Sequence, residues 1–100
     1  MAAELINDVS FQQSSETRFL LGIIAIETLS APYKKAKEKN SARCQRVIRQ
    51  FLDDARAVKF APLYKKRNDF AHEEIGKGIL DQEAADARQI AADLLLAQLP

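Results

Sequence analysis

Three side chains that could carry out chemistry lie close together in the segment 65–75: Arg67, Asn68 and His72, the only histidine of the chain. A guanidinium is a permanent cation whose planar fork matches two oxygens of a phosphate. A histidine titrates near neutral pH and can move a proton. Asn68 and His72 are four residues apart, so on a helix they share a face. The trio could therefore bind and cleave a phosphodiester.

The direction in which Arg67 points follows from helical geometry. At about 100° per residue, Arg67 falls inside the apolar arc that contains Leu63 and Phe70. Lys65 and Lys66 fall on the opposite, solvent-facing side. Arg67 is therefore expected to point toward the interior of the domain, whereas its lysine neighbours do not.

A purely structural reading of the same residues is also open. Charged side chains are rarely buried without a partner, so Arg67 could form an ion pair with Glu74 or with Glu27. His72 could be a boundary residue whose hydrogen bonds are satisfied by Asn68. In that reading the segment stabilises the fold and has no catalytic part.

The net charge of +1 hides a strong segregation of charge along the chain. Residues 33–67 contain twelve Lys and Arg against three acids, a net +9, and the remainder contains three against eleven, a net −8. A block this basic could follow a phosphate backbone, and we expect RNA contacts from Arg43, Arg46, Arg49, Lys65 and Lys66. The alternative is that these side chains form ordinary solvated helix faces.

The apolar spacing predicts an all-α fold, an antiparallel four-helix bundle that occupies residues 1–100 as one domain. The first predicted helix follows Ser14 and Ser15, contains Phe19 to Leu29 and ends or kinks at Pro32, with residues 33–39 as a polar extension. The second is capped by Ser41 and includes Val47, Ile48, Phe51, Leu52, Ala55 and Val58. The third begins near Pro62 and ends at Gly76–Gly78, and the fourth opens at Asp81 and carries Ile90, Ala91, Leu94, Leu95 and Leu99. Residues 1–13 are expected to add a short helix or to fray.

Composition limits the class of protein. A single cysteine, Cys44, excludes an intramolecular disulfide and is expected to be a buried thiol of a reduced cytoplasm. The most apolar run, residues 19–26, is too short to span a bilayer, so no membrane contact is expected. The chain has one histidine and no cluster of His and Cys residues, so we expect no metal site. It also lacks a Gly-rich phosphate-binding loop, so we expect no nucleotide cofactor.

The stretch "LYKKRNDFAHE" resembles the signature of the HEPN domain family, in which an arginine and a polar residue precede a histidine. The resemblance matches Arg67, Asn68 and His72, late in an all-helical domain and ahead of a final amphipathic helix. It implies a homodimeric, metal-independent endoribonuclease of a toxin–antitoxin or anti-phage defence system, with the two motifs facing one cleft. RNA would be the substrate and an antitoxin protein a possible partner.

Two further interpretations remain open. The "RN-x-FAH" type segment is also similar to mannitol operon repressor-like proteins, although the glycine-rich stretch expected ahead of it in that family has no counterpart here. Many HEPN domains are catalytically silent, so the chain could be a module that binds RNA, a nucleotide or a protein.

In the enzyme interpretation, His72 moves the proton, Arg67 stabilises the phosphorane and Asn68 orients His72.

Overall fold

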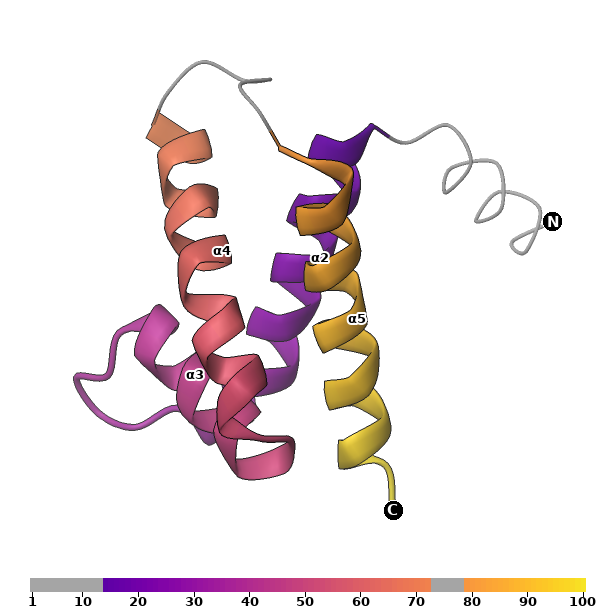
Figure 1. The fold of residues 1–100 in the computed structure, drawn as a ribbon. Helices are drawn as coiled ribbons and strands as arrows, with labels where there is room; N and C mark the ends of the chain where they lie inside the picture. The colour runs from indigo at the N-terminus through magenta and orange to yellow at the C-terminus, as the bar shows by residue number, and fades with distance from the viewer. Residues whose placement is uncertain (1–13, 73–78) are drawn as a thin grey trace, which may run out of the picture.

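The fold is an all-α bundle of four helices, as the sequence predicts (Figure 1). The computed structural model describes residues 14–72 and 79–100, with the backbone alone for residues 70–72. The helices are α2 (Ser15–Ser30), α3 (Asn40–Phe51), α4 (Asp54–His72) and α5 (Asp81–Gln98), with a short 3-10 turn η1 (Ala31–Tyr33) after α2. These ranges contain no strand. The expectations for residues 1–13 and for the glycines at 76 and 78 fall outside the described residues.

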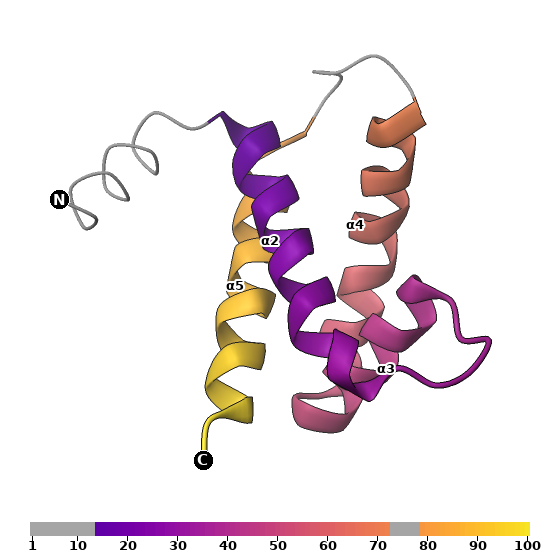
Figure 2. The ribbon, with the colours of Figure 1, turned by 180° about the vertical axis from the view of Figure 1, so that it is seen from behind.

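Helix α2 begins at a serine cap and ends just before a proline. The Ser14 hydroxyl caps it by accepting a hydrogen bond from the Thr17 N–H at 3.2 Å. Pro32 follows its end, and the chain then turns away. The predicted polar extension through residues 33–39 is wrong beyond η1, because Lys34 is extended and Lys37 has a φ of 65°. Residues 34–39 form a loop that projects from the side of the bundle (Figure 2).

The boundary between α3 and α4 differs from the sequence prediction. Helix α3 ends at Phe51, and its N-cap is Lys39 in place of the predicted Ser41. Asp53 opens α4, since its carboxylate accepts a hydrogen bond from the Arg56 N–H at 2.8 Å. The predicted second helix, which ran on to Val58, is therefore two helices joined by a tight turn.

Pro62 lies inside α4 and does not start it, which corrects the predicted start of the third helix. Proline has no N–H, so the carbonyl of Val58 loses its helical hydrogen-bond donor. Both Pro62 and Val58 are exposed, so water can hydrate that carbonyl. The helix continues because Phe60, Leu63 and Tyr64 are buried on its inner face.

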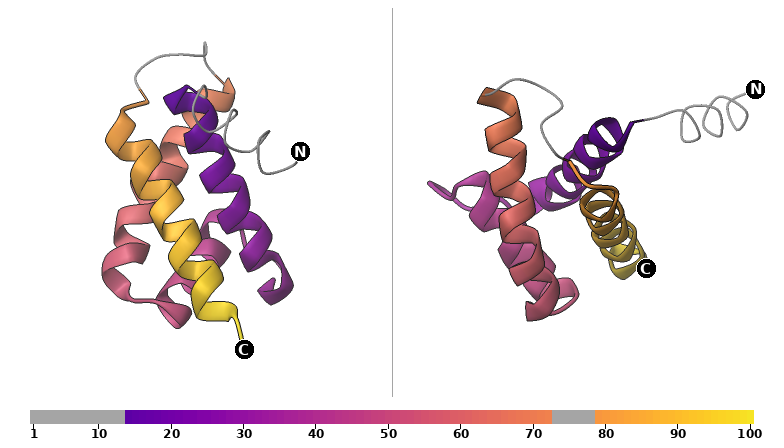
Figure 3. Two further views of the ribbon diagram at one scale, coloured as in Figure 1. Left: turned by 90° about the vertical axis from the view of Figure 1, so that its right-hand side faces the viewer. Right: turned by 45° about the horizontal axis from the view of Figure 1, so that its top comes forward.

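Helices α2 and α5 share the largest interface in the bundle and run parallel, side by side (Figure 3). Ser15 donates a hydrogen bond to Asp81 at their N-terminal ends, and Gln98 Nε2 donates to the Leu29 carbonyl at 3.2 Å near their C-terminal ends. Gly22 permits this approach, since a Cβ there would lie 3.1 Å from the backbone of Ala87. Helix α4 runs antiparallel to both.

The core lies between these helices. Its largest fully buried apolar side chains are Phe19, Ile23, Ile26, Val47, Ile48, Phe60 and Leu94. Two leucines that the sequence pattern assigned to the apolar face of the last helix, Leu95 and Leu99, are half exposed. The polar site lies at one border of this core, where α2, α3 and α4 meet.

Candidate functional site

Arg67 is held on the inner side of α4 by three neighbours. Its Nη2 lies 3.7 Å from Oε1 of Glu27, its Nη1 donates a hydrogen bond to Oδ1 of Asn68 at 3.1 Å, and its guanidinium lies 5.5 Å from the ring centroid of Tyr64. The Arg67 side chain is 35% exposed, so it is only partly covered by these neighbours. The predicted inward orientation is confirmed, as is Glu27 as its ion-pair partner. Glu74, the other predicted partner, lies outside the described residues.

Glu27 connects α2 to α4 through two contacts. Its second oxygen accepts a hydrogen bond from the Tyr64 hydroxyl at 3.3 Å. Burial and the nearby Glu27 carboxylate raise the pKa of Tyr64, with the Arg67 charge acting against them. The phenol is therefore a neutral hydrogen-bond donor at physiological pH.

Arg43 approaches the same face of α2 from α3. It is only 6% exposed, and its Nε donates a hydrogen bond to the Ser30 hydroxyl at 3.3 Å. The same hydroxyl lies 3.3 Å from the sulfur of Cys44, a free thiol whose pKa is raised by burial. Arg43, which the sequence analysis expected to contact RNA, is therefore a largely buried cation beside a buried thiol.

The other predicted RNA-binding residues lie on the surface but already have acidic partners. Arg46 binds Glu38 through its Nε at 2.8 Å, and Arg49 binds Asp54 at 2.7 Å. Lys66 binds Glu83 of α5 at 2.7 Å, and Lys65, the most exposed of these residues, lies 3.5 Å from Asp69. Each of these four cations therefore already has a carboxylate neighbour.

The loop between η1 and α3 contains four lysines that the sequence analysis did not single out: Lys34, Lys35, Lys37 and Lys39. All four are exposed, and within the described part of the chain none of their ammonium groups forms an ion pair within 4 Å. The backbone N–H of Lys35 donates a hydrogen bond to Oε1 of Glu38 at 3.3 Å. The segment "YKKAKEK" was predicted to be a polar extension of the first helix. In the structure, these four lysines and Glu38 lie on a projecting loop.

The position of His72 is defined by its backbone alone. It is the last residue of α4, one helical turn beyond the exposed Asn68. The predicted contact between Asn68 and His72 stays a prediction. Asn68 has a described role as the acceptor for Arg67.

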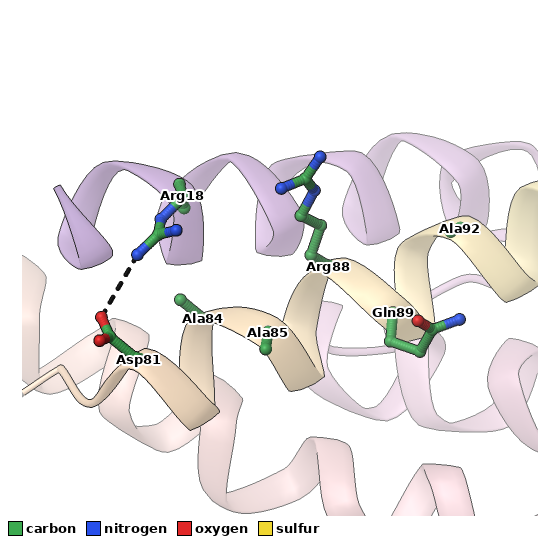
Figure 4. A pocket seen from close by; sticks show the side chains of 7 residues that line it. All are labelled: Arg18, Asp81, Ala84, Ala85, Arg88, Gln89 and Ala92. Atoms are coloured by element: carbon green, nitrogen blue, oxygen red, sulfur yellow. Dashed lines mark hydrogen bonds and ion pairs between the residues drawn. The ribbon is translucent and has the colours of Figure 1, made fainter. Parts of the chain in front are cut away.

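A second concave site lies between α2 and α5. It has a volume of about 560 Å³ and is lined by Arg18, Asp81, Arg88, Gln89 and three alanines (Figure 4). Arg18 binds Asp81 at 3.3 Å, while its Nε is enclosed without a hydrogen-bond partner. The groove carries a carboxylate and has no contact with Arg67, so it does not contribute to the site on α4.

Comparison of the chain with models of known protein families, with characterised proteins and with solved structures finds no match. Over residues 14–72 and 79–100, no helix combines the length and the apolar content that a membrane span requires. The same residues contain no group of three His, Cys, Asp or Glu side chains arranged to bind a metal ion. The polar cluster where α2, α3 and α4 meet is therefore the candidate site.

Proposed function

We propose that the protein is a metal-independent endoribonuclease of the HEPN type that acts in a toxin–antitoxin or defence system. The observation that supports this is the state of Arg67. Its guanidinium is held by Asn68, Glu27 and Tyr64, and the side chain as a whole is still about one-third exposed. It lies five residues ahead of the only histidine. A fixed cation with an open side is suited to stabilise charge that develops on a phosphate.

In the proposed reaction, the ribose 2′-oxygen attacks the adjacent phosphorus. The bond from phosphorus to the 5′-oxygen breaks, leaving a 2′,3′-cyclic phosphate and a 5′-hydroxyl. His72 takes the 2′-OH proton or returns a proton to the leaving oxygen, which typically contributes ~10²–10⁴-fold in rate. Arg67 stabilises the phosphorane, and Asn68 orients the two.

Glu27 would hold Arg67 in position until RNA binds. At 3.7 Å the pair lies beyond the usual range of a charge-assisted hydrogen bond. A phosphate oxygen at a shorter distance could therefore take over the guanidinium without the loss of a strong contact. The same pair keeps the buried side of the arginine neutralised in the free protein.

RNA would be bound outside the cluster by surface cations. Lys34, Lys35, Lys37 and Lys39 offer charge without an intramolecular partner among the described residues, and Lys65 adds a weakly paired one. Arg46, Arg49 and Lys66 would have to leave close ion pairs first. We therefore assign the loop lysines a larger share of backbone binding than the arginines of α3.

The second candidate function is a catalytically silent module that binds RNA, a nucleotide or a protein, including a mannitol operon repressor-like regulator. The ion pair between Arg67 and Glu27 favours it, because this contact stabilises the fold whether or not a reaction takes place. In that case the cations matter for binding and His72 does not.

The two functions differ in what His72→Ala does. For a ribonuclease, we expect His72→Ala and Arg67→Ala each to lower the cleavage of a single-stranded RNA by at least 100-fold, in EDTA as well as in magnesium. Cleavage is measured by gel electrophoresis, and the cyclic phosphate end by mass spectrometry. Thermal unfolding of each variant separates lost chemistry from lost fold.

Lys59→Ala is the matched control, because Lys59 is an exposed residue of α4 that binds Asp86 at 3.3 Å. It should cleave RNA at the wild-type rate. Wild-type protein that binds RNA and leaves it intact would contradict the ribonuclease and support the binding module.

A further inference from the structure

Within the described residues, no carboxylate lies within 4 Å of the Arg43 guanidinium. The residue is 94% buried, and its one hydrogen bond goes from Nε to a neutral hydroxyl, Ser30. Its two Nη atoms have no hydrogen-bond partner in that part of the chain. They are not enclosed either, since Arg18 Nε is the only enclosed side-chain nitrogen or oxygen without a partner there. They must therefore touch solvent.

Arg43 and Arg67 converge on adjacent turns of the same helix. Arg43 reaches Ser30, and Arg67 reaches Glu27, which lies three residues earlier on α2. Positions three apart on a helix share a face and have Cβ atoms about 5–6 Å apart. Two guanidinium groups from two different helices are thus directed at one short stretch of α2.

The negative charge in this region is too small for two arginines. Glu27 supplies one carboxylate, and the C-terminal end of α2 at Ser30 adds the equivalent of about half a charge. Against two permanent cations, an excess of positive charge remains among the described residues. Buried charges normally have a partner, so an anion from outside would complete the arrangement.

We propose that Arg43 and Arg67 together bind a phosphate group, with the hydroxyl of Tyr64 as a third donor once Glu27 is displaced. A guanidinium presents paired donors to phosphate oxygens, and Tyr64 is neutral and lies against Arg67. A phosphate of the RNA backbone and free phosphate offer the same oxygens. The source of the phosphate rests on the proposed ribonuclease function, but the site itself does not.

The test is protection against thermal unfolding by inorganic phosphate, pyrophosphate and a short 2′-O-methylated RNA that cannot be cleaved. All samples are held at one ionic strength with sodium chloride. At ten times the dissociation constant, we expect the wild-type Tm to rise by roughly 5–10 °C. Arg43→Gln and Arg67→Gln should each weaken binding at least tenfold, and Arg88→Gln, an exposed arginine of α5, should not change it.

Two further variants keep the test valid if loss of Arg43 impairs folding. Arg43→Lys retains the charge without the guanidinium fork and should bind phosphate more weakly than wild type. Glu27→Gln removes the competing carboxylate and should bind phosphate several-fold more tightly, a gain that misfolding cannot produce. Titration calorimetry measures both affinities.

Several outcomes would overturn the proposal: no protection of the wild type by any of the three ligands, equal protection of wild type and Arg43→Gln, or weaker binding by Glu27→Gln. Protection by the RNA alone, lost in Arg43→Gln, would assign the site to the RNA backbone. A protein that fails to cleave RNA but binds pyrophosphate through Arg43 would contradict the ribonuclease and leave the phosphate site in place.

Discussion

Most charged surface residues of this protein are paired with a neighbour, and Glu38 is the strongest example. Its carboxylate accepts hydrogen bonds from Nε of Arg46 at 2.8 Å and from Nη2 at 2.9 Å. The Arg46 hydrogen bond lowers the pKa of Glu38 to about 2, although partial desolvation acts in the other direction. Arg46 also donates to the Tyr33 carbonyl, so the pair ties the lysine loop to η1 and α3.

This pair predicts a pH-dependent contribution to stability. The folded-state pKa of Glu38 lies below its ordinary value of 4.5, so the stabilisation is fully present above pH 4.5 and is lost as the pH falls toward 2. We expect Glu38→Gln to be less stable than wild type at pH 7, with the difference vanishing near pH 2. Urea unfolding at a series of pH values measures it. Asp54→Asn, in a more exposed pair with Arg49, should show a smaller change.

Single-residue placement could be predicted from the sequence only in part. The inward direction of Arg67 follows from its spacing relative to Leu63, and Glu27 was one of two partners that composition allowed. Arg43 was predicted to contact RNA because it belongs to the basic block of residues 33–67. Its position one residue before Cys44 and four before Val47, both buried, would have indicated an inner face. Arg43 and Arg67 reach adjacent turns of α2 because of the way α3 and α4 pack on that helix. A local sequence pattern does not encode this packing.

At the level of helices, the turn between α3 and α4 determines which residues reach the site. Helix α3 ends at Phe51 with Leu52 as its C-cap, and Asp53 caps α4 by accepting a hydrogen bond from the Arg56 N–H. The Asp53 carboxylate also pairs with the Arg56 side chain, which in turn binds Asp93 of α5 at 3.1 Å. One aspartate therefore fixes both the start of α4 and its alignment with α5.

Removal of this cap should be measurable. We expect Asp53→Ala to lower the free energy of unfolding by about 1–2 kcal/mol, because the first turn of α4 loses an acceptor. Asp53→Asn should retain most of the stability, since asparagine caps equally well. Asp54→Ala, one residue later and exposed, should stay within about 0.5 kcal/mol of wild type. Guanidinium chloride unfolding distinguishes these values, and equal effects at the two aspartates would exclude a specific cap.

The start of a helix could be predicted where a side chain interacts with the backbone of the first helical turn. Ser14 and Asp81 lie at the starts of their helices, and Glu83 accepts a hydrogen bond from the Leu80 N–H at 2.9 Å. The break at Leu52 and Asp53 was missed because the apolar spacing continues across it from Phe51 to Ala55. Pro62 was taken as a helix start, its usual place. Packing of Phe60 and Leu63 outweighs the cost of about 3 kcal/mol for a proline in a helix interior.

On the scale of the whole molecule, we expect the protein to form a dimer. The resemblance implies a site formed between subunits, and large apolar side chains such as Leu21, Ile24 and Leu95 are half exposed on α2 and α5. We expect light scattering to give the mass of a dimer at tens of micromolar and a smaller mass on dilution. A monomer at every concentration would contradict a composite site and leave Arg67 and His72 to act within one chain.

The parallel pairing of α2 and α5 has a consequence for biosynthesis. Fifty residues separate the end of α2 at Ser30 from the start of α5 at Asp81. At roughly 5–20 residues per second, a ribosome needs about 3–10 s to make them. Over that interval the apolar side of α2, with Phe19, Ile23 and Ile26, lacks its main partner, although α3 and α4 can already form their hairpin. We therefore expect α2 to be the segment of the nascent chain that a chaperone binds.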